Sequence, residues 1–342
     1  MNDSKLVLVT GATGYIGGRL VPNLLEAGYP VRCLVRDANR LQGRPWSDQV
    51  EVVEGDALRP ETLAPAMEGV WATYYFIHSL TDTKEYRERD KLVARDFGRA
   101  AKEAGIERII YLGGLGDPGD ELSDHLRSRQ ETGAALAEAG VPVTEFRAAV
   151  IVGAGSLSFE MVRYLTERLP VMICPRWVYT RIQPTAIRDL LHYLVRALAV
   201  PESAGRIIEI GGADVLTYGD MMKGYAKVRG LRRYLIPVPV LTPRLSAHWV
   251  HWMTPVPGGI IYPLIEGLRN EVVVRDDTAQ TLFPDIQPVD YETAVRRALS
   301  NLDAGQVETR WTDSLSSSQG NQPPVELATE QGMQLERRQG IV

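Results

Sequence analysis

The feature that most constrains this chain is a glycine-rich turn near its N-terminus. The run VLVTGATGYIGGRL places Gly11, Gly14 and Gly17 between a short apolar run and a helical pattern. In this context the first glycine permits a tight turn and the second lets backbone approach a pyrophosphate. The third lets the helix pack closely on the strand. A strand, a turn and a helix in this order predict a dinucleotide-binding Rossmann domain.

Short β-branched runs alternate with helical stretches through the first half of the chain. Strands are expected at 5–10, 31–35, 50–54, 70–76, 108–112 and 141–147, and helices at 16–27, 86–103 and 123–138. Strands that alternate with helices favour a parallel sheet covered on both faces. Because such crossovers are right-handed, the pattern predicts an α/β fold with a doubly wound parallel Rossmann sheet.

After residue 153 the alternation loosens. Helices are expected at 157–168, 185–198 and 218–229, with a strand at 206–210. We therefore predict an NAD(P)-binding Rossmann domain over 1–155 and a smaller, mostly helical C-terminal substrate lobe over 156–302. Residues 303–342 are polar and include the run SLSSSQGNQPP, which predicts a flexible C-terminal tail.

Charge and cysteine content exclude several classes of protein. The net charge is −5, with acidic and basic residues interspersed, so we expect no nucleic-acid partner. Cys33 and Cys174 lie far apart with no clustered His, which excludes a disulfide framework and a Cys-based zinc site, and no metal is expected. With neither a signal peptide nor a long apolar stretch, the chain is expected to be cytoplasmic.

The second predicted strand bears on the choice of cofactor. An acid at this point binds the ribose 2′-hydroxyl of NAD, whereas an arginine accommodates the 2′-phosphate of NADP. Here the strand ends in Arg36, followed by Asp37. The planar fork of Arg36 favours NADP(H), and Asp37 leaves NAD(H) open as the alternative.

Further cofactor contacts are expected along the same edge of the sheet. Asp56 and Ala57 follow the third strand, where they would flank the adenine, although Asp56 could instead cap the helix near residue 60. His78 lies at the tip of the fourth strand, facing the cofactor or capping a loop. The full set of expected cofactor-binding residues is Gly11, Thr13, Gly14, Tyr15, Ile16, Gly17, Arg36, Asp56, Ala57 and His78.

Several motifs carry a family resemblance. With TGATGYIG, LVRD, GDALRPETL, YYFIHSL and GRIIEIGGADVLTYGDMM, the chain resembles the NmrA-like branch of the atypical short-chain dehydrogenases/reductases. That branch includes the Rossmann accessory subunit of respiratory complex I. The resemblance covers most of the chain and implies NAD(P)H binding. It also implies a reductase-type hydride transfer.

The catalytic positions of conventional family members are not kept. Those members have a Ser after the fifth strand and a YxxxK pair on the next helix. Here Gly113 and Gly114 occupy the Ser region, His125 stands in place of Tyr and Arg129 in place of Lys. In an enzyme, His125 would be the proton donor and Arg129 would bind a ribose or phosphate. Alternatively, His125 begins a helix and Arg129 forms a structural salt bridge.

The second half of the chain holds candidate substrate contacts. The sixth strand ends in Arg147, and the block CPRWVYTRIQP contains Arg176, Trp177 and Arg181. These side chains could bind an anionic head group. Alternatively, the block could form an inter-lobe salt-bridge cluster. The stretch 234–268 is rich in Pro, Trp and aliphatic residues. It could line an apolar pocket, make a peripheral membrane contact, or be buried in the core or an oligomer interface.

Two functions follow from these observations. The first is an NADP(H)-dependent oxidoreductase that reduces a small or apolar carbonyl, enone or quinone with non-standard catalytic residues. The second is a non-catalytic dinucleotide-binding protein, either a redox sensor or an assembly or accessory protein. Its ligand would be a redox ligand rather than a substrate.

Overall fold

The computed structural model of the protein describes residues 5–77, 84–117, 119–238, 265–304, 307 and 309–313, with only the backbone at 84–86, 326–330 and 333–337. The predicted site residue His78 and most of the stretch 234–268 lie outside the described residues. Among the residues that the structure describes, no helix is long and apolar enough to cross a membrane.

Seven parallel strands form the central sheet, in the order β11-β6-β5-β4-β1-β2-β3. Their bounds are β1 (Val7–Thr10), β2 (Val31–Val35), β3 (Glu51–Glu54), β4 (Ala72–Tyr75), β5 (Arg108–Gly114), β6 (Val143–Ala148) and β11 (Ile207–Ile210). The order reverses between β1 and β4, which is where a doubly wound sheet opens its ligand crevice. The predicted Rossmann sheet is confirmed.

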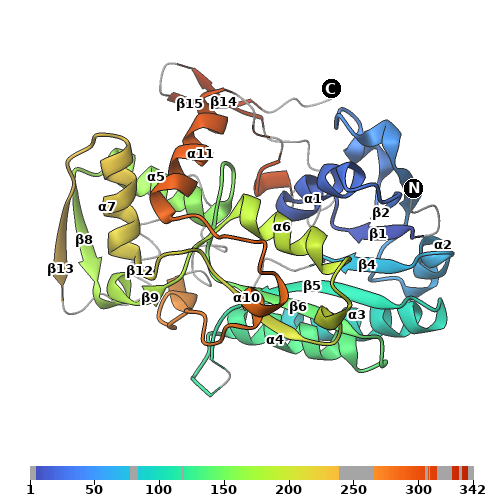
Figure 1. The fold of residues 1–342 in the computed structure, drawn as a ribbon. Helices are drawn as coiled ribbons and strands as arrows, with labels where there is room; N and C mark the ends of the chain where they lie inside the picture. Colours follow the sequence, from blue (N-terminus) through green and yellow to red (C-terminus); the bar gives the residue numbers. More distant parts are fainter. Residues whose placement is uncertain are drawn as a thin grey trace.

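Helices cover both faces of the sheet (Figure 1). On one face lie α1 (Tyr15–Glu26) and α6 (Ile187–Ala197), whose leucines share a core with β1. On the other face lie α3 (Lys84–Glu103) and α4 (Asp124–Ala137), which enclose a second core around Tyr111. The runs that form β1, β4 and β5 are apolar on both sides because both faces are buried.

The C-terminal lobe packs around a third core. Its helices are α5 (Leu157–Arg168), α7 (Tyr218–Val228) and α11 (Tyr291–Asp303), and its short strands pair as β7 (Ile151–Val152) with β10 (Thr185–Ala186), β9 (Arg181–Ile182) with β12 (Leu216–Thr217), and β8 (Val171–Pro175) with β13 (Tyr234–Val238). β11 and α6 lie beyond the expected boundary at residue 155 and pack with the sheet layer.

The start of the expected flexible tail is packed against α1. Thr309 is 1% exposed, and its hydroxyl donates to the Tyr15 carbonyl at 2.9 Å and accepts from Arg19 Nε at 2.9 Å. Trp311 N donates to the Gly155 carbonyl at 2.9 Å. Composition cannot show this, because a polar residue is held here by a buried partner far away in the chain. Farther on, β14 (Glu326–Glu330) pairs antiparallel with β15 (Met333–Arg337).

Thr309→Val tests this attachment. The variant keeps the shape of the side chain but leaves the Arg19 Nε and the Tyr15 carbonyl without their hydroxyl partner. We expect the free energy of unfolding in urea to fall by about 1–3 kcal/mol. The control is Thr281→Val at an exposed position of α10 (Thr278–Leu282). Equal stability of the two variants would contradict the buried contact.

Candidate functional site

The glycine turn between β1 and α1 leaves no room for side chains. Gly11 has φ +68°, and a Cβ on it would lie 2.9 Å from the Phe76 carbonyl oxygen. A Cβ on Gly17 would lie 2.4 Å from the Gly11 carbonyl oxygen. The turn closes with Gly14 N donating to the Gly11 carbonyl at 2.9 Å. Two of the three predicted glycines are therefore required by the turn itself.

The first turn of α1 has no side-chain cap. Gly14 is its N-cap, with extended backbone and no side-chain hydrogen bond, and the first turn has no acidic residue. Side-chain oxygens cap α4, α5, α7 and α11, whereas α6 (Ile187–Ala197) also starts without a side-chain cap. The N–H groups of the first turn of α1, which no side chain caps, and the positive end of the helix dipole suit an anion. This arrangement fits the pyrophosphate of a dinucleotide, with Thr13, Tyr15 and Ile16 flanking Gly14 in the same turn.

Asp37 and Arg36, at the end of β2, have different surroundings. Asp37 Oδ1 accepts from Asn39 N at 3.0 Å and thereby caps the 3₁₀ helix η1 (Ala38–Leu41). Arg36 is exposed. Partial burial lowers the pKa of Arg36, the nearby Asp56 raises it, and Arg40 lowers it again. The acid is thus engaged in a local cap, while a positively charged side chain stands at the tip of the strand.

Asp56 also makes local hydrogen bonds. Its Oδ1 accepts from Leu58 N at 3.0 Å, and its own N donates to Thr62 Oγ1 at 2.9 Å. These bonds shape the turn before the 3₁₀ helix η3 (Pro60–Thr62) and α2 (Leu63–Met67). Asp56 does not cap either helix, because the N-cap residues are Arg59 and Thr62 and neither start has a side-chain cap. Ala57 is buried in the core beneath α3. The adenine contacts expected of Asp56 and Ala57 stay predictions.

The end of β5 is closed to the side chain that conventional members carry there. A Cβ on Gly113 would lie 2.8 Å from Glu145 Oε1, and one on Gly114 would lie 2.9 Å from Leu126 Cδ2. On α4, a Cβ on Gly133 would lie 2.3 Å from Glu145 Oε2. The Glu145 carboxylate therefore fills the space between β5 and α4, so a Ser at position 113 would displace Glu145 and a Ser at position 114 would displace the Leu126 side chain.

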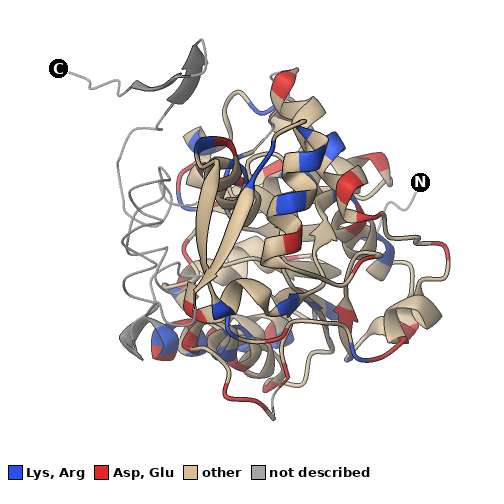
Figure 2. Cartoon of the chain, turned by 90° about the vertical axis from the view of Figure 1, so that its left-hand side faces the viewer, with Lys and Arg blue, Asp and Glu red and all other residues tan. Residues whose placement is uncertain are grey.

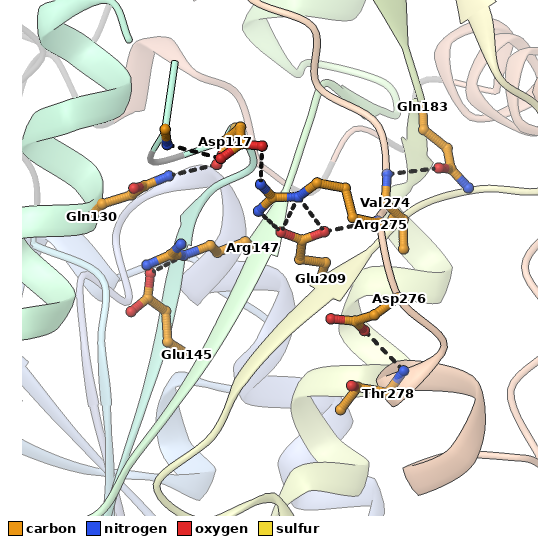
Figure 3. A network of polar contacts seen from close by, with 12 residues as sticks. Asp117, Gln130, Glu145, Arg147, Gln183, Glu209, Val274, Arg275, Asp276 and Thr278 are labelled. Atoms are coloured by element: carbon orange, nitrogen blue, oxygen red, sulfur yellow. Dashed lines mark hydrogen bonds and ion pairs between the residues drawn. The ribbon is translucent and has the colours of Figure 1, made fainter. Parts of the chain in front are cut away.

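Arg147, an expected substrate residue, pairs with this buried carboxylate. Its Nε donates to Glu145 Oε1 at 2.7 Å, and both side chains are less than one-tenth exposed. Figure 3 shows the two side chains pointing toward one another. Burial raises the pKa of Glu145, and the hydrogen bond and charge of Arg147 oppose that rise. Arg147 is level with Gly113 in the sheet register, at the edge where ligands of this fold bind.

His125 and Arg129 lie one turn apart on α4. His125 is the second residue of the helix and is partly buried. Arg129 Nη2 donates to the Leu112 carbonyl of β5, its guanidinium lies 5.1 Å from the centre of the Tyr111 ring, and its own carbonyl accepts from the Tyr111 hydroxyl at 2.9 Å. Arg129 thus ties α4 to the sheet through a backbone carbonyl and an aromatic ring, and no salt bridge of Arg129 is found among the described residues. Its expected ligand contact stays a prediction.

The other three expected substrate residues do not converge on one point. Arg176 is exposed in the 3₁₀ helix η4 (Arg176–Tyr179), and Arg181 is exposed and pairs with Glu271 at 3.4 Å. Trp177 packs on the cluster of Met161 and Ile265. Its buried Nε1 has no hydrogen-bond partner among the described residues. It is the one of the three that offers a buried donor to a ligand.

A polar cluster that the sequence did not reveal spans the same edge of the sheet (Figure 3). Arg275 Nε donates to Glu209 Oε1 at 3.0 Å, and Arg275 Nη1 lies 2.9 Å from Asp117 Oδ2. Glu209 also accepts from Arg275 N at 2.9 Å. These bonds fix the segment around Arg275 across β11 and the loop after β5. One feature of the sequence could have indicated these buried polar contacts. The apolar strands β6 and β11 each contain a glutamate, Glu145 in VTEFRA and Glu209 in IIEI.

Sequence comparisons agree with this geometry. The sequence profile of the NAD(P)H-binding family matches residues 11–163. The ceramide reductase of Caulobacter vibrioides is 30% identical over 243 residues, which cover 68% of this chain and 74% of that protein. The chain belongs to the NAD(P)H-binding, NmrA-like branch of the atypical short-chain dehydrogenases/reductases. The photosystem II assembly factor Ycf39 of Trieres chinensis is 26% identical over 252 residues, covering 67% of this NmrA-like chain and 73% of Ycf39.

Solved structures show the same fold. The triphenylmethane reductase of Citrobacter sp. matches this NmrA-like protein with a TM-score of 0.69 at 20% identity, covering 86% of this chain and 99% of that one. The NADPH-dependent quinone oxidoreductase QOR2 of Escherichia coli matches with a TM-score of 0.68 at 18% identity, with the same coverage.

Gly113→Ser tests the crowding at β5. Restoring the conventional Ser should force its Cβ against Glu145 and lower the free energy of unfolding by about 1–3 kcal/mol, as overpacking does. The same change made in a Glu145→Ala background should cost less, because the obstructing carboxylate is gone. Urea unfolding of the four proteins measures both costs. Equal costs in the two backgrounds would show that Glu145 is not what excludes the side chain.

Proposed function

We propose that this protein is an NADP(H)-dependent reductase of an apolar carbonyl, enone or quinone. The observation that carries the cofactor choice is the end of β2, where Asp37 caps η1 and Arg40 stands close enough to Arg36 to lower its pKa. A 2′-phosphate between two arginines would relieve their repulsion and accept charge-assisted hydrogen bonds. With Asp37 engaged in its cap, NAD(H) loses the acid that would recognise its ribose.

The residues at the sheet edge divide the remaining tasks. Gly14 and the bare first turn of α1 would hold the pyrophosphate, and Arg36 would hold the 2′-phosphate. When bound, the reduced nicotinamide supplies a hydride. His125, at the position of the conventional Tyr, would give the proton that the reduced oxygen needs. Arg147, at the end of β6, would polarise the substrate oxygen from its place beside Gly113.

The substrate class rests on the relatives and on the lobe. Three of the similar proteins are named for ceramide, quinone and triphenylmethane substrates. In this chain, the lobe brings Trp177 with its unpartnered donor beside Met161 and Ile265. An apolar ligand with one oxygen acceptor suits such a wall.

A non-catalytic, dinucleotide-binding function is the second candidate. The observation that favours it is the filling of the catalytic region, where Glu145 and Leu126 crowd Gly113 and Gly114 and Arg129 binds the Leu112 carbonyl. Among the relatives, Ycf39 is named as an assembly factor. Such a protein would keep the intact glycine turn but need no proton donor.

Arg36→Ala tests the cofactor preference. The variant should weaken NADPH binding by about 1.5–3 kcal/mol, the size of a lost charge-assisted hydrogen bond, and NADH binding by much less. Isothermal titration calorimetry measures both, with Arg99→Ala at an exposed position of α3 as the control. Equal losses for NADPH and NADH would remove Arg36 from the 2′-phosphate.

Turnover separates the two candidate functions. We expect NADPH fluorescence to decay when the protein is given quinone, enone or aldehyde acceptors. His125→Ala should slow this decay by about 10²–10⁴-fold, as loss of a general acid does. His192→Ala, at an exposed position of α6, should leave the rate unchanged. Tight NADPH binding without decay for any acceptor would instead favour the non-catalytic function.

A further inference from the structure

The pair β8 and β13 exposes an apolar face to solvent. The strands run parallel with Val171 opposite Tyr234 and Ile173 opposite Ile236. These four side chains are 47%, 64%, 53% and 49% exposed, respectively. Along β8, the buried residues Met172 and Cys174 alternate with the exposed Val171 and Ile173 and pack into the core of the lobe. One side of this small sheet therefore packs inward and the other presents a patch of large apolar side chains.

Exposed large apolar side chains are concentrated in this patch and scattered over the rest of the described surface. Among the described residues, ten large hydrophobic side chains are exposed, and five of them belong to β8, β13 and the adjoining Tyr179 of η4. Single exposed apolar residues are ordinary on soluble proteins, whereas a contiguous patch marks a surface that binds something apolar. We call these five residues, Val171, Ile173, Tyr179, Tyr234 and Ile236, the apolar face.

Positive charge surrounds the apolar face. Residues 161–181 and 218–238 contain nine Arg and Lys but only two acidic residues, whereas the whole chain has net charge −5. Four of these cations pair with carboxylates, three of which lie outside the two segments; the pairs are Arg163–Glu160, Arg181–Glu271, Lys227–Glu292 and Arg229–Glu167. Arg176, Lys223 and Arg232 are exposed, and no ion pair involves them among the described residues. We call these three residues the basic rim. In Figure 2, which turns this side toward the viewer, Lys and Arg bands follow one another along α7 beside the two strands.

The charge argues against a second copy of the chain as the occupant. A two-fold interface brings the same patch of both copies together, so a basic rim would face a basic rim. An anionic bilayer surface complements both features, because headgroups attract the rim while the apolar face enters the boundary with the acyl chains. Directly after β13, residues 239–264 hold one charged residue, Arg244, together with Trp249, Trp252 and Tyr262. Such a composition is typical of sequences at membrane interfaces.

We propose that the apolar face and its basic rim dock this protein on membranes that carry anionic lipids. Attraction between the rim and the headgroups orients the lobe, and Ile173 and Ile236 then leave water together with the two tyrosines. The proposal is independent of the reductase function, since a non-catalytic protein would use the same surface.

Flotation of the full-length protein with vesicles tests the proposal. The protein should float with phosphatidylcholine vesicles that contain phosphatidylserine, and much less with phosphatidylcholine alone. The double variant Lys223→Glu/Arg232→Glu should lower the partition coefficient by about tenfold or more, since each cation near such a surface contributes measurably. Ile173→Glu should lower it too, by removing an apolar contact and adding a repelled charge.

Leu92→Glu is the matched control. Leu92 lies on α3 and is 53% exposed, as Ile173 is. The Leu92→Glu substitution therefore adds the same charge as Ile173→Glu at an equally exposed position away from the basic rim. It should bind vesicles nearly as well as the unaltered protein, and circular dichroism should confirm that all variants fold. The proposal is overturned if the unaltered protein ignores anionic vesicles or if all variants bind equally. A dimer that Ile173→Glu dissociates, without vesicle binding, would assign the face to a second copy instead.

Discussion

The approach of α1 to the turn that precedes it is the constraint on which the rest of the structure depends. The Cα of Gly17 packs so close to the Gly11 carbonyl that no side chain fits between them. This contact aims the first turn of α1, with its uncapped N–H groups, at the carboxyl ends of the paired strands β1 and β4, between which the strand order reverses. The same helix carries Arg19, which reaches the Ala154 carbonyl and Thr309, so the lobe and the C-terminal segment are positioned from it.

A second constraint is a buried ion pair beside the end of β5. Glu145 and Arg147 bring two opposite charges into the interior between β5, β6 and α4, and such a pair is stable only when its members satisfy one another. Gly113 and Gly133 make room for the carboxylate, which a side chain at either position would displace. The two glycines and the ion pair therefore depend on one another, and a reductase mechanism at this edge of the sheet would have to work around a fixed Glu145.

Much of the sheet could be predicted because its signals are local. The apolar runs and the capping residues Ser123 and Ser156 define β1 to β6, α4 and α5 within a residue or two. Contacts between distant segments could not be predicted in this way. Arg275 pairs with Glu209, which lies 66 residues away in the sequence, and β8 pairs with β13 over a similar sequence separation. No local sequence pattern indicates either pairing. Asp37 shows a third kind of difficulty. The sequence alone does not distinguish an acid at a strand end that binds a ribose from one that caps a turn.

The Thr309 contact also orders events in time. Arg19 and Thr309 are 290 residues apart, and domains begin to fold while the chain is still being synthesised. The sheet strands β1 to β6 are available early, yet the groove that Thr309 fills beside Gly18 stays open until residue 309 has left the ribosome. A nascent chain that has not reached this residue therefore carries an incompletely braced glycine turn, and packing around α1 is completed long after the strands of the sheet are available.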